Sequence, residues 1–148
     1  MRTIWVARHG NRQDFVDPLR SKTAARPDDP DLCEAGLRQA RELGCRLARE
    51  PIDHIIASPF LRTMRTASCV AEAAGLPFHV DYGLSEWINS DWFKQWPVLL
   101  SVKERREAFP SLDESHESQV MPKYGETGEE ALARAGEAMR LLLHTFEG

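Results

Sequence analysis

The sequence predicts an α/β fold in which a largely parallel sheet is flanked by helices. Short apolar runs alternate along the chain with longer segments whose apolar residues recur at helical spacing, and this alternation is typical of parallel sheets. The hydrophobic fraction of 42% and the charged fraction of 28% are those of an ordinary globular protein. With this composition we expect a single domain that spans residues 1–148.

The N-terminal part of the chain contains the first predicted strand and a long loop. Thr3–Ala7 is an apolar, partly β-branched run, which predicts a buried strand that ends at Arg8. Residues 11–31 contain three prolines and many charges, so we expect a surface loop whose length favours a functional role. The helical spacing of apolar residues over 34–49 predicts an amphipathic helix.

A second strand, a tight turn and a helix are predicted next. His54–Ala57 is the strand, Ser58 offers a side chain that can cap a helix, and Pro59 suits the first helical position. We expect this helix to run to Ala74 and to end at Gly75, because glycine tolerates the left-handed conformation found at helix C-termini.

The C-terminal half begins with a third predicted strand, Phe78–Val80. Residues 84–96 are rich in tryptophan, and a short helix is expected near residues 101–108, bounded by prolines. Thr127 begins a capping box, which predicts a final amphipathic helix whose core-facing residues are Leu132, Ala135, Met139, Leu142 and Phe146.

Charge and cysteine content exclude several classes of protein. The net charge of -4 argues against nucleic-acid binding, which depends on many lysines and arginines. No segment resembles a secretory signal or a membrane span, so we expect a cytoplasmic protein with no membrane partner. The three cysteines lack the spacing of a disulfide framework or a zinc site, so we expect them to be reduced and structural.

Positively charged side chains follow two of the predicted strands. Arg8 and His9 follow the first strand, and Arg62 lies in the first turn of the helix after the second strand. Ligands of open α/β sheets gather beyond the carboxyl ends of the strands, and helix N-termini and arginine forks suit phosphate, so these residues predict an anion site. Taken singly, His9 also fits an ordinary loop or core histidine, and Arg62 fits a surface charge.

A series of short motifs resembles the phosphoglycerate-mutase-like histidine phosphatase superfamily. No motif is specific alone, but their order over nearly the whole chain is. The motifs are Arg8-His9-Gly10, Leu32-Cys33-Glu34-Ala35-Gly36 with Gln39-Ala40, Ser58-Pro59-x-x-Arg62-x-x-x-Thr66-Ala67, Leu84-Ser85-Glu86 and Gly125-Glu126. The resemblance implies a phosphoglycerate mutase-like fold and a phosphomonoesterase of the histidine acid phosphatase type that needs neither metal nor cofactor.

The resemblance also implies roles for individual residues. His9 is expected to accept the phosphoryl group as phosphohistidine, and Glu86 to act as the acid and base. Arg8 and Arg62 are expected to hold the phosphoryl oxygens. Asn11 is expected to touch the same oxygens, although it also fits a turn residue after the glycine.

The first motif favours hydrolysis over isomerisation. Cofactor-dependent mutases resemble Arg-His-Gly-x-Ser-x-x-Asn, whereas this chain has Arg12 and Phe15 at the Ser and Asn positions. Arg-His-Gly-x-Arg is similar to phosphatase branches, including Sts-type signalling phosphatases, which also place a tryptophan after the acid/base glutamate, as Trp87 is here. Arg12 is then expected to enlarge the positively charged site, although it also fits a residue that only forms a salt bridge. Trp87, Trp92 and Trp96 are expected to line the mouth of the site, and they also fit core packing or a partner surface.

The sequence departs from the family near its C-terminus. The family has a second catalytic histidine in a Ser/Gly-His-Gly type motif after the last helix, and no histidine other than His9 precedes a glycine here. We therefore expect a C-terminally incomplete domain, either a fragment or a shortened family member, with exposed strand edges and low stability. Loss of one donor to the transition state predicts activity lower by roughly a hundredfold or more. Cys33 also stands where the family usually has threonine at a helix N-cap.

The leading hypothesis is a phosphomonoester hydrolase acting on a small phosphorylated substrate or a phosphoprotein. A catalytically weak phosphate-binding or interaction domain is the alternative, and a phosphoglycerate mutase-type phosphotransferase is a third. The sequence leaves open whether the substrate is a sugar phosphate, a nucleotide or a phosphoprotein, and it leaves open the oligomeric state.

Overall fold

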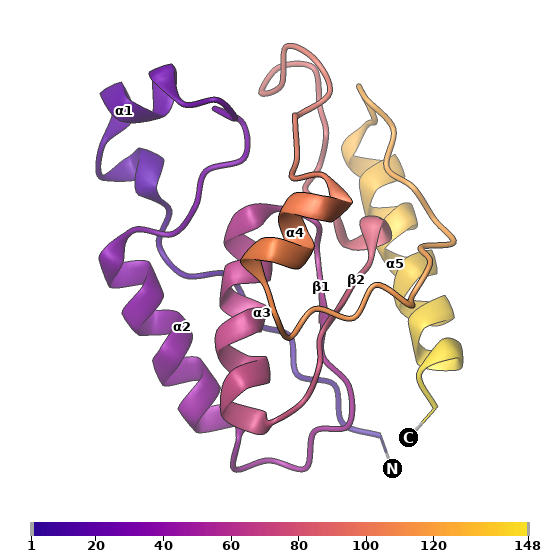
Figure 1. Ribbon diagram of the computed structural model, residues 1–148. Helices are drawn as coiled ribbons and strands as arrows, with labels where there is room; N and C mark the ends of the chain where they lie inside the picture. The colour runs from indigo at the N-terminus through magenta and orange to yellow at the C-terminus, as the bar shows by residue number, and fades with distance from the viewer. Residues whose placement is uncertain (1, 148) are drawn as a thin grey trace.

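The computed structural model describes residues 2–147, without the side chains of residues 20 and 21, and has an α/β architecture (Figure 1). The strands β1 and β2 pair in parallel, and helices α2 and α3 lie on one side of them with α5 on the other. The predicted fold class is therefore confirmed. In chain order the elements are η1 (Gln13–Phe15), α1 (Pro18–Thr23), α2 (Glu34–Leu47), β1 (Ile56–Ala57), α3 (Leu61–Ala74), β2 (His79–Val80), η2 (Tyr82–Leu84), α4 (Val102–Ala108) and α5 (Gly128–Thr145).

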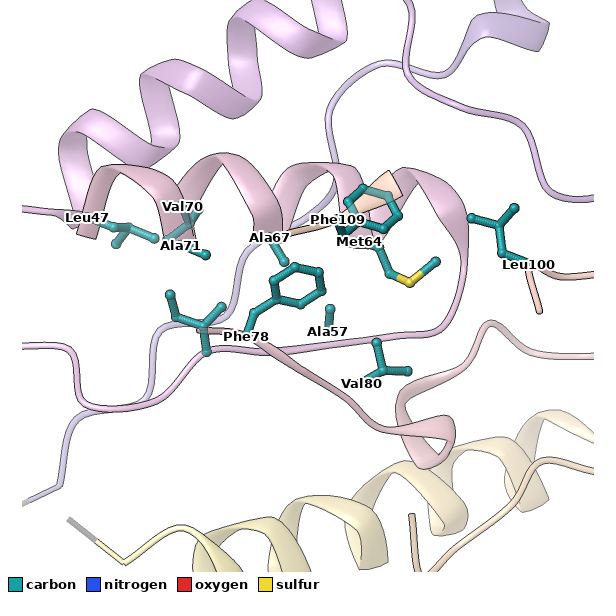
Figure 2. Packing of buried hydrophobic residues seen from close by; sticks show 11 residues of the cluster. Leu47, Ala57, Met64, Ala67, Val70, Ala71, Phe78, Val80, Leu100 and Phe109 are labelled. Atoms are coloured by element: carbon teal, nitrogen blue, oxygen red, sulfur yellow. The ribbon is translucent and has the colours of Figure 1, made fainter. Parts of the chain in front are cut away.

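The main hydrophobic core lies between α3 and the two strands (Figure 2). Met64 of α3 faces Ala57, and Phe78 reaches up from the strand side into the same cluster. The Phe78 ring meets the edge of Phe109, with ring centroids 6.0 Å apart. Each large side chain buried in this way stabilises the fold by about 1.5–3 kcal/mol, so the core fixes α3 firmly on the strands.

Helix α3 begins at Leu61, two residues later than predicted. Ser58 does not cap it; instead its carbonyl oxygen accepts a hydrogen bond from the Thr63 hydroxyl at 2.7 Å. The cap comes from the long loop, where Asp29 Oδ1 accepts the Leu61 N–H at 2.7 Å. The predicted end is confirmed, because Gly75 adopts the left-handed conformation with φ 68°.

The N-terminal residues 3–7 do not form the predicted strand. Ile4, Trp5 and Val6 are 50%, 48% and 90% exposed, although a buried strand was expected. A strand forms only where a neighbour completes its hydrogen bonds, and the part of the chain that the structure describes offers this segment no such neighbour. Apolar periodicity alone could not reveal that.

Two long segments lie at the end of the molecule where β1 and β2 finish (Figure 1). One is residues 11–31, which contains η1 and α1 rather than continuous loop. It is tied to α3 by Arg65, whose Nη2 donates to Asp31 Oδ2 at 2.8 Å. The other is the tryptophan-rich segment after η2. Both therefore lie where the sheet places a ligand site.

Helix α5 has the predicted start, and its predicted buried face is correct in part. Thr127 forms the expected capping box with Glu130. Leu142 is buried as predicted, together with Arg134 and Ala138, three of the other predicted residues are half-buried, and Leu132 is 76% exposed. The prediction missed Arg134 because it counted apolar residues only. Within residues 2–147, no helix combines the length and apolar character needed to cross a bilayer.

Gly10 and Gly36 allow the segment after His9 to lie directly on the start of α2. A Cβ atom at Gly36 would lie 2.2 Å from the Asn11 carbonyl oxygen, and one at Gly10 would lie 2.3 Å from the Gly36 carbonyl oxygen. Contacts this short with backbone atoms cannot be relieved by moving a side chain. The two glycines of the motifs are therefore required by the close approach of two backbones.

Gly36→Ala is expected to lower the free energy of unfolding by at least about 2 kcal/mol, because the new Cβ forces apart α2 and the segment after His9. Gly136→Ala is the matched control: it lies inside helix α5, a Cβ there meets nothing within 4 Å, and the change should stabilise by about 0.5–1 kcal/mol. Urea unfolding of both variants measures the difference. Equal effects of the two changes would contradict the close approach.

Candidate active site

The segment that carries Arg8 and His9 is held between α2 and α3. The Gly10 N–H donates to the Thr66 hydroxyl of α3 at 3.3 Å, and the Asn11 N–H donates to Gln39 Oε1 of α2 at 2.9 Å. The Asn11 carbonyl oxygen accepts from the Cys33 N–H at 2.9 Å. These contacts place the segment after His9 beside the start of α2 and the second turn of α3.

The hydrogen bond of His9 fixes its tautomer. Nδ1 lies 2.7 Å from the Gly10 carbonyl oxygen, and since a carbonyl can only accept, Nδ1 carries the proton. Partial burial lowers the pKa of His9; the Gly10 carbonyl opposes this, and the charges of Arg62, Arg8 and Arg12 lower the pKa further. The imidazole is therefore neutral at pH 7, with the lone pair on Nε2 free to attack an electrophile.

Arg62 is deeply buried, with 3% of its surface exposed. Its guanidinium carbon lies 4.5 Å from the centre of the Phe60 ring, and Nη2 donates to Glu86 Oε2 at 3.3 Å. Nε and Nη1 are buried and have no hydrogen-bond partner among residues 2–147. Buried donors are almost always paired, so a guanidinium with two free nitrogens is suited to an external anion.

Glu86 joins Arg62 from the loop after η2. Its Oε2 accepts from Arg62, and its Oε1 accepts the Trp87 N–H at 3.1 Å. The side chain remains 37% exposed, so the carboxyl group has access to a bound ligand. The structure thus brings together His9, Arg62 and Glu86, as the sequence predicted.

Arg8, Arg12 and Asn11 take more peripheral places. Arg8 is exposed, and its charge acts on His9. Arg12 binds Asp14 through Nε at 2.9 Å and through Nη2, and it lies over the Phe15 ring, so it forms a salt bridge. Its charge also lowers the pKa of His9, and its contact with a phosphate stays a prediction. Asn11 is exposed and contributes its backbone groups to the fold. Its contact with phosphoryl oxygens stays a prediction.

The three tryptophans near Glu86 are partly exposed. Trp87, Trp92 and Trp96 have exposed fractions of 36%, 64% and 40%. The rings of Trp87 and Trp92 lie 5.3 Å apart in an edge-to-face arrangement, and Trp87 Nε1 donates to the Glu126 carbonyl oxygen at 2.7 Å. Core packing therefore does not account for them, and their place at the mouth of the site stays a prediction.

Asp29 is a site residue that the sequence reading missed. It is 2% exposed and binds the Leu61 N–H through Oδ1, while Oδ2 is buried without a partner among the described residues. Burial raises its pKa to about 6, although the Leu61 N–H and the charges of Arg62 and Arg26 oppose the shift. Nothing in the local sequence distinguishes Asp29 from the other aspartates of this loop, so its burial at the start of α3 could not be predicted.

The cysteines are free, as expected, and Cys33 caps α2 through Sγ, which accepts the Gly36 N–H at 3.4 Å. Sulfur thus forms the cap at the position where the resemblance implies a threonine hydroxyl. Over the described part of the chain, no group of three histidine, cysteine or acidic side chains is placed to hold a metal ion.

Comparison with known proteins assigns the family. The profile of the histidine phosphatase superfamily (branch 1) matches residues 4–148, so the chain belongs to that superfamily. The transcription factor tau 55 kDa subunit of Saccharomyces cerevisiae is 28% identical over 98% of this chain and 35% of that protein. The probable phosphoglycerate mutase GpmB of Yersinia pestis is 34% identical over 66% of this chain and 43% of that protein. The chain thus spans less than half the length of these relatives.

Solved phosphatases share the fold. The ecdysone phosphate phosphatase from Bombix mori in complex with tungstate superposes with a TM-score of 0.76 at 22% identity, covering 93% of this chain and 65% of that one. A mycobacterial glucosyl-3-phosphoglycerate phosphatase complexed with VO3 gives a TM-score of 0.60 at 23% identity, covering 93% and 62%. The predicted phosphoglycerate mutase-like fold is confirmed.

The buried Asp29 predicts a specific pH dependence of stability. Because its pKa is raised in the folded state, its contribution to stability is complete below about pH 4 and is lost as the pH rises through about 6. Asp29→Asn keeps an oxygen for the Leu61 N–H but cannot ionise. As the pH rises from about 4 to 7, the free energy of unfolding of Asp29→Asn should therefore increase relative to that of the parent by roughly 1–3 kcal/mol.

Urea unfolding of both proteins at a series of pH values checks this expectation. Asp28→Asn, at the neighbouring position of the same loop, is the matched control for the loss of one carboxyl group. Parallel stability curves for the parent and Asp29→Asn would show that Asp29 ionises normally.

Proposed function

We propose that the chain hydrolyses phosphomonoesters through a phosphohistidine formed on His9. The observation that carries the proposal is the buried Arg62, whose two unpartnered nitrogens lie beside a neutral histidine and a partly exposed carboxyl group. A phosphoryl group supplies the acceptor oxygens that this guanidinium lacks. Membership of the histidine phosphatase superfamily supports the same reaction.

In the first step, Nε2 of His9 attacks phosphorus while the bond from phosphorus to the ester oxygen breaks. Glu86, in its protonated form, gives its proton to that oxygen, and the alcohol or phenol leaves. In the second step, a water molecule attacks the phosphohistidine, the ionised Glu86 takes its proton, and the phosphorus–nitrogen bond breaks to release phosphate. Arg62 holds the phosphoryl oxygens throughout, and Arg8 adds positive charge at the exposed side.

The substrate is a small phosphorylated molecule or a phosphoprotein in this proposal, which requires no metal. The names of the similar phosphatases give ecdysone phosphate and glucosyl-3-phosphoglycerate as their substrates, which are phosphate esters of two very different alcohols. Three free cysteines support a reducing compartment such as the cytoplasm. A phosphate-binding domain without turnover is the second candidate, because the unpartnered nitrogens of Arg62 suit an anion whether or not it reacts.

His9→Ala is expected to lower the release of p-nitrophenol from p-nitrophenyl phosphate by at least about a thousandfold, because it removes the nucleophile. The assay contains a chelator, and the parent is also quenched in alkali during turnover to trap acid-labile phosphate on the peptide that contains His9. His144→Ala changes an exposed histidine of α5 and serves as the control. Tungstate binding without trapped phosphate would select the binding-only candidate.

Arg62→Lys is expected to weaken tungstate binding by at least about tenfold, because lysine cannot present two parallel donors to an oxyanion. Arg65→Lys is the matched control one turn along α3, since Arg65 already binds Asp31 with two nitrogens. Its tungstate affinity should stay within about threefold of the parent. Calorimetric titration measures both, and equal losses in the two variants would remove Arg62 from the anion site.

A further inference from the structure

A buried ion pair connects helix α5 to the loop that carries Glu86. Arg134 of α5 and Glu126, just before that helix, are 8% and 5% exposed. Arg134 Nε donates to Glu126 Oε2 at 2.9 Å, and Nη2 donates to Oε1. The pair lies outside the group formed by His9 and Arg62, and the steps of hydrolysis above make no use of it.

The remaining donors of Arg134 bind the backbone of the Glu86 loop. Nη1 donates to the carbonyl oxygens of Gly83 at 2.8 Å and Ser85 at 3.1 Å, and Nη2 donates to the carbonyl oxygen of Glu86 at 3.2 Å. A guanidinium has five N–H groups, and Arg134 therefore has a partner for every one of them. It has no donor left for a phosphate, in contrast to Arg62.

Glu126 holds the far side of the same loop. Its Oε1 accepts the Ile88 N–H at 3.2 Å, and its carbonyl oxygen accepts Nε1 of Trp87 at 2.7 Å. Burial alone raises the pKa of Glu126, but the hydrogen bonds from Arg134 and Ile88 and the charge of Arg134 outweigh it and lower the pKa. Glu126 is thus an ionised carboxylate, which fixes Arg134 in place.

The Glu86 side chain itself has few contacts. Its carboxyl oxygens bind only Arg62, at 3.3 Å, and the adjacent Trp87 N–H among the described residues, and the side chain is partly exposed. Its position therefore depends on where the backbone of residues 83–88 is held. That backbone is held by Arg134 and Glu126.

We propose that Arg134, paired with Glu126, is a positioning residue that holds the backbone of residues 83–88 so that the Glu86 carboxyl group reaches the oxygen of the leaving group. This rests on the proposed function, in which Glu86 protonates that oxygen. Arg134 touches neither the substrate nor the phosphoryl group. Its loss misplaces the acid without removing the nucleophile or the anion site.

The experiment compares two substrates that differ in how much they need the acid. p-Nitrophenolate leaves readily without a proton, whereas the more basic phenolate released from phenyl phosphate needs protonation. For Arg134→Lys we expect kcat to fall at least about tenfold with phenyl phosphate but less than about threefold with p-nitrophenyl phosphate, with KM little changed for both. Lysine keeps the charge but lacks the planar fork.

Arg105→Lys is the matched control. Arg105 is also buried and binds Glu114 through Nε and Nη2 and the Tyr82 hydroxyl through Nη1, so its printed partners are side chains and none is the backbone of residues 83–88. Its variant should affect the two substrates equally. Glu86→Gln tests the proposed acid role of Glu86. If its kcat does not fall more with phenyl phosphate than with p-nitrophenyl phosphate, Glu86 is not the acid. If Glu86→Gln shows that loss and Arg134→Lys does not, the positioning role is wrong.

Amide hydrogen exchange gives a second readout that needs no turnover. In Arg134→Lys the amides of Trp87 and Ile88 should exchange at least about tenfold faster than in the parent, while Arg105→Lys leaves their exchange unchanged. Unchanged protection of these amides in a folded Arg134→Lys protein would overturn the proposal, whatever the activity of the chain.

Discussion

The burial of the Arg62 guanidinium is the constraint around which the site is built. Arginine stays charged in proteins, and a buried charge with unpaired donors costs several kcal/mol unless its surroundings compensate. The compensation comes from three separate segments of the chain: the Phe60 ring, the Glu86 carboxylate and the charge of Asp29. Because α3 is fixed on the strands by the core, these partners are arranged around an arginine that cannot move toward solvent.

The same constraint explains the ionisation states nearby. Partial burial, together with three arginine charges, lowers the pKa of His9 and keeps the imidazole neutral at pH 7, which is the form that a nucleophile needs. Asp29 is held beside this positive region, yet burial dominates and raises its pKa to about 6. Three arginine charges therefore act on His9, although the chain carries a net charge of -4. Local arrangement, and not composition, sets the charges around this histidine.

Features with a local signal were predictable from the sequence, and features that depend on distant partners were not. Gly75 and the capping box at Thr127 lie where the sequence placed them, because turn and cap chemistry involves only adjacent residues. The cap of α3 comes from Asp29, 32 residues before Leu61, so the nearer Ser58 was preferred wrongly. The strand expected over residues 3–7 failed for a similar reason, since strand pairing is a property of two segments.

The proximity of His9, Arg62 and Glu86 was predictable, and the contacts that support it were not. Short motifs singled out these residues and the structure brings them together, while their catalytic roles stay a prediction. Arg134 escaped notice because periodicity counts a charged residue as solvent-facing, whereas this one is buried on the inner face of α5. Its partner Glu126 lay in a recognised motif, but nothing in the local sequence indicated which group it would bind.

The hydrogen bonds of Arg134 also bear on the order in which the molecule assembles. They join residues 48 to 51 positions apart, and the contact between Gly10 and Thr66 joins residues 56 positions apart. Helices α2 and α3 and the strand between them are neighbours in sequence, and close neighbours need less chain ordering to meet. Helical content can therefore be acquired before the Glu86 loop is in place. Order in the Glu86 loop, and not helical content, is the observable that reports a completely folded chain.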